Sequence, residues 1–123
     1  MKVPFNINLS GKTAIVTGGS GTLCSAMAYG LAVCGAKVAI IERNKEKLAS
    51  ISEKLTKDAL DEYNKNVTIK GYSCNVINKD ELSAAYETIK NELGSCDILI
   101  NGAGGNQPGA ITSIEMLKKE KED

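Results

Sequence analysis

The sequence predicts an α/β fold built on a parallel β-sheet, and three observations favour it. Short apolar runs alternate with amphipathic segments of helical length. Two of these runs, residues 12–17 and 96–100, are followed at once by glycine-rich loops. The 123 residues, 42% of them apolar, are enough for one domain with a single core. Strands that alternate with helices form parallel sheets with right-handed crossovers.

The first unit begins with a strand at residues 12–17, whose Thr-Ala-Ile-Val run is typical of a strand buried on both faces. Residues 1–11 contain Pro4 and are expected to form at most a brief extended segment. A helix from Thr22 to Cys34 follows. Its spacing predicts an apolar face made of Leu23, Met27 and Leu31.

The second unit begins after Gly35, which ends that helix. Residues 37–41 form the second expected strand, which ends on Glu42. Asn44 is suited to cap a long helix that extends to about Leu60. The buried stripe expected for this helix consists of Leu48, Ile51, Leu55 and Ala59.

The third unit contains a strand at residues 67–73 and a helix that Asn78 and Glu81 open as a capping box. Gly94 ends this helix, and residues 96–100 form the fourth strand. The apolar stripe of the helix is Leu82, Ala85, Tyr86, Ile89 and Leu93.

The order of the strands follows from the crossovers. The first three strands step outward in one direction, and the helix at residues 78–93 returns across the other face. The fourth strand then pairs beside the first, in the order 3-2-1-4. The expected architecture is a three-layer sheet, half of a doubly wound fold, whose switch point brings together the loops at residues 18–21 and 102–105.

The first of these loops has the composition of a phosphate cradle. Gly18, Gly19 and Gly21 can take positive φ, and the helix that follows directs its positive end at the same place. A plain tight turn without a ligand is the alternative. A phosphate-loop NTPase is excluded, because Gly11 precedes the strand and Asn6 stands where its motif needs a glycine.

Glu42 indicates which phosphate compound is expected. A carboxylate at the end of the second strand, 24 positions after Gly18, can accept both hydroxyls of an adenosine ribose. Taken alone, Glu42 is better explained as an acid that leads a helix and pairs with Arg43. With the glycine loop and the second loop at Asn101, a dinucleotide site is favoured. Arg43 could hold a 2'-phosphate, so NADP stays open, but NAD is expected.

Composition excludes several classes of function. Fifteen basic and fifteen acidic residues give zero formal net charge, so no nucleic-acid or membrane partner is expected. The chain has no histidine, which excludes histidine acid/base chemistry and ordinary His-ligated zinc, and we expect no metal site. No apolar run has the length of a membrane span, and no signal-peptide order is present. We expect reduced thiols at Cys24, Cys34, Cys74 and Cys96, and a cytoplasmic location.

These residues together resemble the amino-terminal half of a short-chain dehydrogenase/reductase, a Rossmann-like family, over nearly the whole chain. Thr17-Gly18 opens a loop similar to T-G-x-x-x-G-x-G, Asn75-Val76 stands where the family has Asp-Val, and residues 101–104 resemble N-N-A-G. The resemblance extends the expected cofactor-binding residues to Gly18, Gly19, Ser20, Gly21, Thr22, Leu23, Glu42, Arg43, Asn75, Val76, Asn101, Gly102, Ala103 and Gly104.

The chain departs from the family pattern at four places. Thr22 and Cys24 replace loop glycines, Asn75 replaces the carboxylate that meets the adenine, and Gly102 replaces the second asparagine of N-N-A-G. The runs at residues 23–25 and 102–106 resemble the D-mannonate oxidoreductase, or fructuronate reductase, branch of the family.

The resemblance implies hydride transfer between a secondary alcohol and a nicotinamide. The family uses a tyrosine as acid/base, a lysine that lowers its pKa and a serine that orients the substrate. Its Y-x-x-x-K motif follows a fifth strand. In this chain the spacing occurs only at Tyr86 and Lys90, where the helical stripe predicts core packing, so no catalytic residue is assigned.

Three hypotheses follow. In the first, residues 1–123 are one dinucleotide-binding domain, cut short after the fourth strand. It would be the cofactor half of a homo-oligomeric sugar-acid or polyol oxidoreductase, with NAD as cofactor and no turnover of its own. The second is a stand-alone dinucleotide-binding module without catalysis. The third is a remnant without cofactor affinity.

Overall fold

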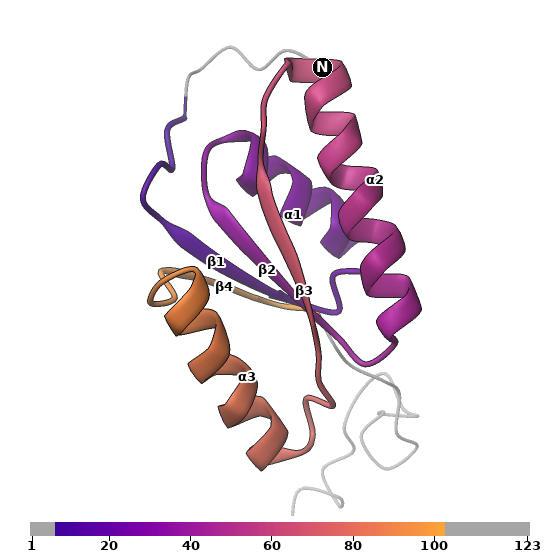
Figure 1. Cartoon of the computed structure of the whole chain (residues 1–123), viewed down its shortest axis with the longest axis vertical. Helices are drawn as coiled ribbons and strands as arrows, with labels where there is room; N and C mark the ends of the chain where they lie inside the picture. The colour runs from indigo at the N-terminus through magenta and orange to yellow at the C-terminus, as the bar shows by residue number, and fades with distance from the viewer. Residues whose placement is uncertain (1–6, 103–123) are drawn as a thin grey trace, which may run out of the picture.

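The structure is a computed structural model that describes residues 7–102, and within this range strands and helices alternate strictly (Figure 1). The elements in chain order are β1 (Thr13–Thr17), α1 (Thr22–Val33), β2 (Lys37–Glu42), α2 (Lys45–Tyr63), β3 (Thr68–Ser73), α3 (Lys79–Glu92) and β4 (Ile98–Asn101). No helix among these residues is long and apolar enough to cross a membrane.

The four strands form one parallel sheet in the order β3-β2-β1-β4, which confirms the expected topology. The register places Thr17 of β1 between Ile41 of β2 and Asn101 of β4. Glu42 at the end of β2 lies opposite Ser73 at the end of β3. The carboxyl ends of all four strands are therefore level at one edge of the sheet.

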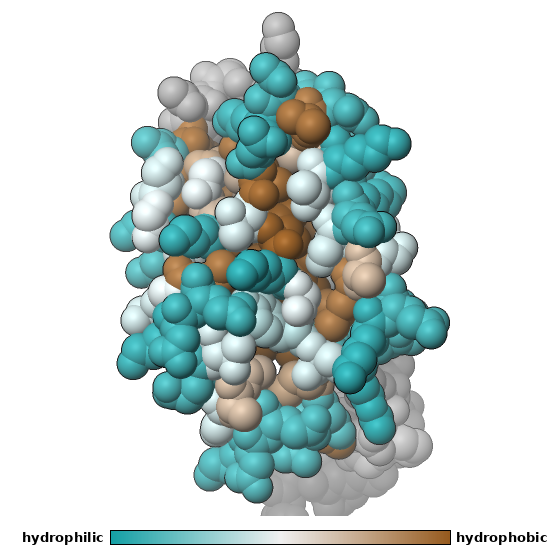
Figure 2. Space-filling model, viewed as in Figure 1, coloured by the Kyte–Doolittle hydropathy of each residue, from teal (hydrophilic) through white to brown (hydrophobic). Residues whose placement is uncertain are grey.

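The sheet is the middle of three layers. α2 and α3 lie on opposite sides of it (Figure 1). Successive residues of a strand point to opposite faces of the sheet. Accordingly, Ala14 and Val16 of β1 pack with residues of α1 and α2, and Ile15 packs with Ile89 and Leu93 at α3. On the face shown in Figure 2, apolar side chains reach the surface along the middle, and the margins are hydrophilic.

The buried face of α1 differs from the expected one. The residues that pack against the sheet are Cys24, Ala28 and Ala32, whereas Leu23 is 71% exposed. Only small side chains fit between this helix and the strands, so the face of α1 with the smallest side chains packs against the sheet. Met27 and Leu31 flank that row and are only partly buried.

Helix ends follow the expected caps closely. The side-chain oxygen of Asn44 accepts hydrogen bonds from the amides of Glu46 and Lys47 at 3.0 and 3.1 Å. α2 continues to Tyr63, three residues beyond its expected end, and stops at Asn64, whose φ is +54°. Of the capping box expected at Asn78, the structure shows its side chain accepting from two amides of α3.

Candidate functional site

The edge of the sheet at the carboxyl ends of the strands gathers the residues selected from the sequence. Gly18 follows β1, Glu42 ends β2, Asn75 follows β3, and Asn101 ends β4. The register brings these four strand ends side by side. Two further candidates, Ala103 and Gly104, lie outside the described residues.

The three loop glycines serve different purposes. Gly18 has a φ of +71°, and its amide donates to the carbonyl of Ile41 at 2.9 Å. Gly19 and Gly21 do not share this conformation, so of the three glycines that can take positive φ only Gly18 does. Gly19 is required for space instead: a Cβ built on it would overlap the side chain of Ile40.

The amino terminus of α1 is open toward this edge. Its N-cap, Gly21, has no side chain to cap it, and the first turn carries no acidic residue. The first intrahelical bond runs from Ser25 N to Gly21 O at 2.8 Å, so the amides of Thr22 and Leu23 precede it. α2 and α3, by contrast, are capped by asparagine and have acids in their first turns. An uncapped helix start with exposed amides suits an anion.

Ser20 connects the loop to the end of β2. Its hydroxyl donates to Glu42 Oε2 at 2.7 Å, and the carboxylate is partly buried. This bond uses one of about four acceptor positions of the carboxylate, so others are left for ligand hydroxyls. Among residues 7–102 no ion pair joins Glu42 to Arg43, and the pairing considered as the alternative role of Glu42 is absent there.

Asn75 and Val76 lie beyond the end of β3. The side-chain oxygen of Asn75 accepts from the amide of Ile77 at 3.2 Å. The two N–H donors of the Asn75 amide and the second lone pair of its oxygen are left for a ligand. Val76 packs against the core on the α3 side of the sheet.

Thr17 joins the two glycine loops and was singled out from the sequence only as part of a motif. The amide of Gly102 donates to both the carbonyl and the hydroxyl oxygen of Thr17, each at 3.1 Å. Thr17 Oγ1 also lies 3.5 Å from Asn101 Oδ1. The sequence signal is a hydroxyl residue that directly follows the apolar run at residues 14–16 and precedes Gly18. In the structure Thr17 is buried.

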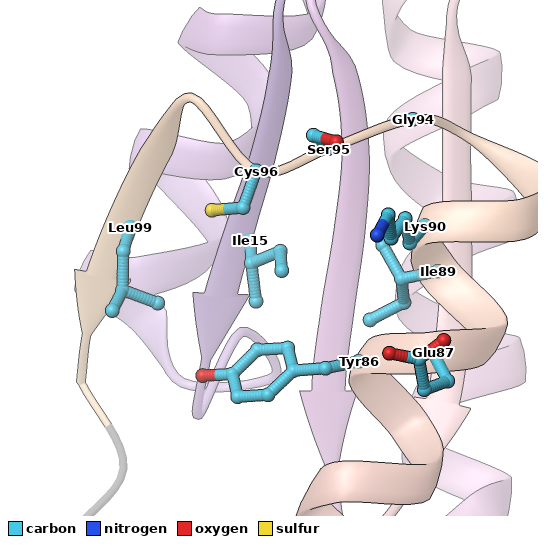
Figure 3. A pocket seen from close by; sticks show the side chains of 9 residues that line it. All are labelled: Ile15, Tyr86, Glu87, Ile89, Lys90, Gly94, Ser95, Cys96 and Leu99. Atoms are coloured by element: carbon cyan, nitrogen blue, oxygen red, sulfur yellow. The ribbon is translucent and has the colours of Figure 1, made fainter.

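Tyr86 and Lys90 belong to α3 and lie on the face of the sheet that α3 covers. Both line a groove of about 430 Å³ between α3 and β4, and Ser95, which precedes β4, lines it too. Figure 3 shows these side chains, with Tyr86 and Ser95 toward opposite ends of the groove. Burial, and then Cys96 and Cys74, raise the pKa of Tyr86, whereas a catalytic tyrosine needs a lowered pKa. Tyr86 also packs against the core, as expected from its helical stripe. No cluster of metal-binding side chains occurs among the residues described.

The sequence matches known proteins along most of its length. A family model described as short chain dehydrogenase matches residues 12–121. An uncharacterized oxidoreductase, UxuB, of Bacillus subtilis is 42% identical over 120 residues, which are 98% of this chain and 41% of that protein. A 2-dehydro-3-deoxy-D-gluconate 5-dehydrogenase of Formosa agariphila is 39% identical over 99 residues, 79% of this chain and 34% of its own. The chain thus spans about two fifths or less of these relatives.

Solved structures show the same likeness. A candidate D-mannonate oxidoreductase from Haemophilus influenzae with bound NAD is 36% identical, with a TM-score of 0.68 over 93% of this chain and 38% of that one. A metagenomic short-chain oxidoreductase in complex with NADP is 29% identical, with a TM-score of 0.69 over 79% of this chain and 41% of that one.

Proposed function

The chain belongs to the short-chain dehydrogenase family, and from that premise we propose that it is the cofactor-binding half of an NAD(P)-dependent oxidoreductase. One observation carries the proposal. The open start of α1 and the Ser20–Glu42 pair lie at the same edge of the sheet, at the switch point of the strand order. Such an edge offers N–H donors for a pyrophosphate beside a carboxylate for a ribose.

The residues present fit a dinucleotide. The amides of Thr22 and Leu23 would hold the pyrophosphate, Glu42 the adenosine ribose and Asn75 the adenine. When bound, the cofactor supplies a nicotinamide that exchanges a hydride with the carbon of a secondary alcohol. Residues at the second loop, Asn101 and Gly102 among them, would line the other side of the crevice.

NAD is proposed over NADP because Glu42 bears a negative charge where a 2'-phosphate would lie. Arg43, exposed and adjacent, is the feature that favours NADP. Titrating the 123-residue chain with NADH and with NADPH, followed by nucleotide fluorescence, tests the choice. Tighter binding of NADH is expected, tighter binding of NADPH would reverse the assignment, and binding of neither would support the remnant hypothesis.

Replacing Glu42 by Gln should weaken NADH binding by about tenfold or more, because a hydrogen bond to a charged group contributes roughly 1.5–3 kcal/mol. The same change should leave NADPH binding equal or improve it, since the repulsion is gone. The matched control is Glu46→Gln, an exposed acid in the first turn of α2. Equal losses for both variants and both nucleotides would show that Glu42 does not contact the ribose.

For the whole enzyme we propose a sugar acid or polyol as substrate, with D-mannonate and D-fructuronate as the first pair to assay. The names of the gluconate-type relative and of the Haemophilus structure support this class. The serine, tyrosine and lysine would come from sequence that follows Asp123. The intact mass of the protein in its native source distinguishes the two hypotheses. A mass near 13.0 kDa would favour a binding module, and a mass more than twice as large, as for relatives of which the chain spans 41% or less, would favour the complete enzyme.

A further inference from the structure

Cys24 of α1 and Gly102, the residue directly after β4, lie against each other. A Cβ built on Gly102 would overlap Cys24 Sγ, and it would lie 3.0 Å from the carbonyl oxygen of Thr17. Cys24 is 8% exposed, so its thiol is fixed between α1 and the sheet. The sulfur thus occupies the space that any side chain at position 102 would need.

The same two positions are departures from the family pattern. At 24 the chain has a cysteine in place of a glycine, and at 102 it has a glycine in place of an asparagine. One change adds a side chain and the other removes one, 78 positions away in the sequence but in contact in the fold. Exchanges that keep the local volume are the ones a packed interior tolerates.

The contact joins the two sides of the proposed crevice. Cys24 belongs to the first turn of α1, which directly follows the glycine loop at residues 18–21. The amide of Gly102 donates to the carbonyl of Thr17. The spacing between α1 and the backbone of Gly102 is therefore set by a sulfur on one side and a residue without a side chain on the other. The α1 backbone cannot approach Gly102 more closely without displacing the sulfur.

The geometry points to Cys24 and Gly102 as an interlocked positioning pair that fixes the separation of the two loops and thereby the fit of the dinucleotide between them. The inference rests on the proposed function. Cys24 acts through Gly102, so it is a positioning residue. The Cys24 thiol then acts in the site through its volume and not through its reactivity.

The test is a double-mutant cycle on the 123-residue chain. Gly102→Ala alone should lower the urea midpoint and weaken NADH binding by about tenfold, equivalent to ~1.4 kcal/mol of overpacking. In a Cys24→Ala background the same substitution should cost no more than about threefold, because the sulfur is gone and only the close approach to Thr17 O remains. Cys24→Ser is the matched control: its hydroxyl still overlaps the new methyl group and should give no rescue.

An equal cost of Gly102→Ala in all three backgrounds would overturn the inference. If Gly102→Ala does not fold, recovery of folded protein with Cys24→Ala and not with Cys24→Ser supports it, and failure in both contradicts it. The urea midpoints measure the coupling between positions 24 and 102 in the absence of cofactor. A wild-type chain that binds no NADH would therefore refute the proposed function while the cycle still measures the pair.

Discussion

At the scale of single residues, glycines in one short region of the chain are required for different reasons. Gly18 uses a positive φ that other residues rarely adopt, whereas Gly19 is needed because the Ile40 side chain lies where its Cβ would be. Gly30 in α1 has open space around it and no special conformation. A glycine-rich pattern therefore combines conformational, steric and dispensable positions.

Gly19→Ala should destabilise the fold by about 1–3 kcal/mol, because Ile40 is fully buried and cannot move out of the way of the new methyl group. Denaturant unfolding measures the loss. Gly30→Ala is the control, and its effect on the free energy of unfolding should be opposite. Because Gly30 lies inside α1, this substitution should stabilise the fold by roughly 0.5–1 kcal/mol. Loss of stability of equal size in both variants would contradict the steric assignment.

Tyr29 gives the protein a pH dependence in the alkaline range. Burial, and then the nearby Glu62, raise the pKa of Tyr29 from 10.0 to about 12. The unfolded chain loses this proton near pH 10 while the folded chain keeps it, so stability is full below about pH 10 and falls as the pH rises toward 12. Tyr29→Phe should flatten this decline in urea midpoints. The pKa of Tyr72 is also raised, first by burial and then by its bond to Glu92, so part of the decline should remain. An unchanged slope in the Phe variant would contradict the assignment.

At the scale of elements, the order of strands and helices and the helix caps could be predicted because those signals are local. Apolar runs, the caps at Asn44 and Asn78, and Gly35 and Gly94 with positive φ all act within a few residues. The inward face of α1 could not, since the packing distance to the sheet selected its small row. β4 begins at Ile98 and not at Cys96, because the Thr13 amide bonds to the Asp97 carboxylate at 2.9 Å and not to a strand carbonyl.

The candidate site likewise has parts that the sequence predicts and parts that it does not. The positions of Gly18, Glu42, Asn75 and Asn101 at one edge follow from topology alone and were predictable. The bond from Ser20 to Glu42 depends on tertiary distances that no spacing encodes. The same is true of the overlap between residues 24 and 102.

Asn44→Ala should destabilise the protein by about 1 kcal/mol, since the Asn44 side chain accepts from two amides at the start of α2. The loss should extend to function, because Asn44 follows Glu42 and Arg43 directly and fixes where α2 begins. Paired urea unfolding and NADH titrations measure both effects. Asn91→Ala, an exposed site inside α3, is the control and should be neutral or slightly stabilising. Equal effects at the two asparagines would show that the cap contributes nothing.

At the scale of the whole molecule, the sheet leaves one side incompletely covered. Among the described residues β4 pairs with β1 alone. Leu99 of β4 is 48% exposed and lines the groove shown in Figure 3 with Ile15 and Tyr86. The chain has no net charge to oppose contact between copies. An exposed strand edge beside an apolar groove favours self-association.

We therefore expect the 123-residue chain to associate with itself as its concentration rises, and Leu99→Lys to shift that association to higher concentration. A lysine at this position places a charge in the groove, and burying it between two copies would be costly. Light scattering after size-exclusion chromatography over a dilution series measures the effect. Ile77→Lys is the control, because Ile77 is 87% exposed but lies in the loop after β3 and lines no part of the groove. A compact monomer at every concentration, or equal effects of the two lysines, would show that the open side of the sheet does not drive association.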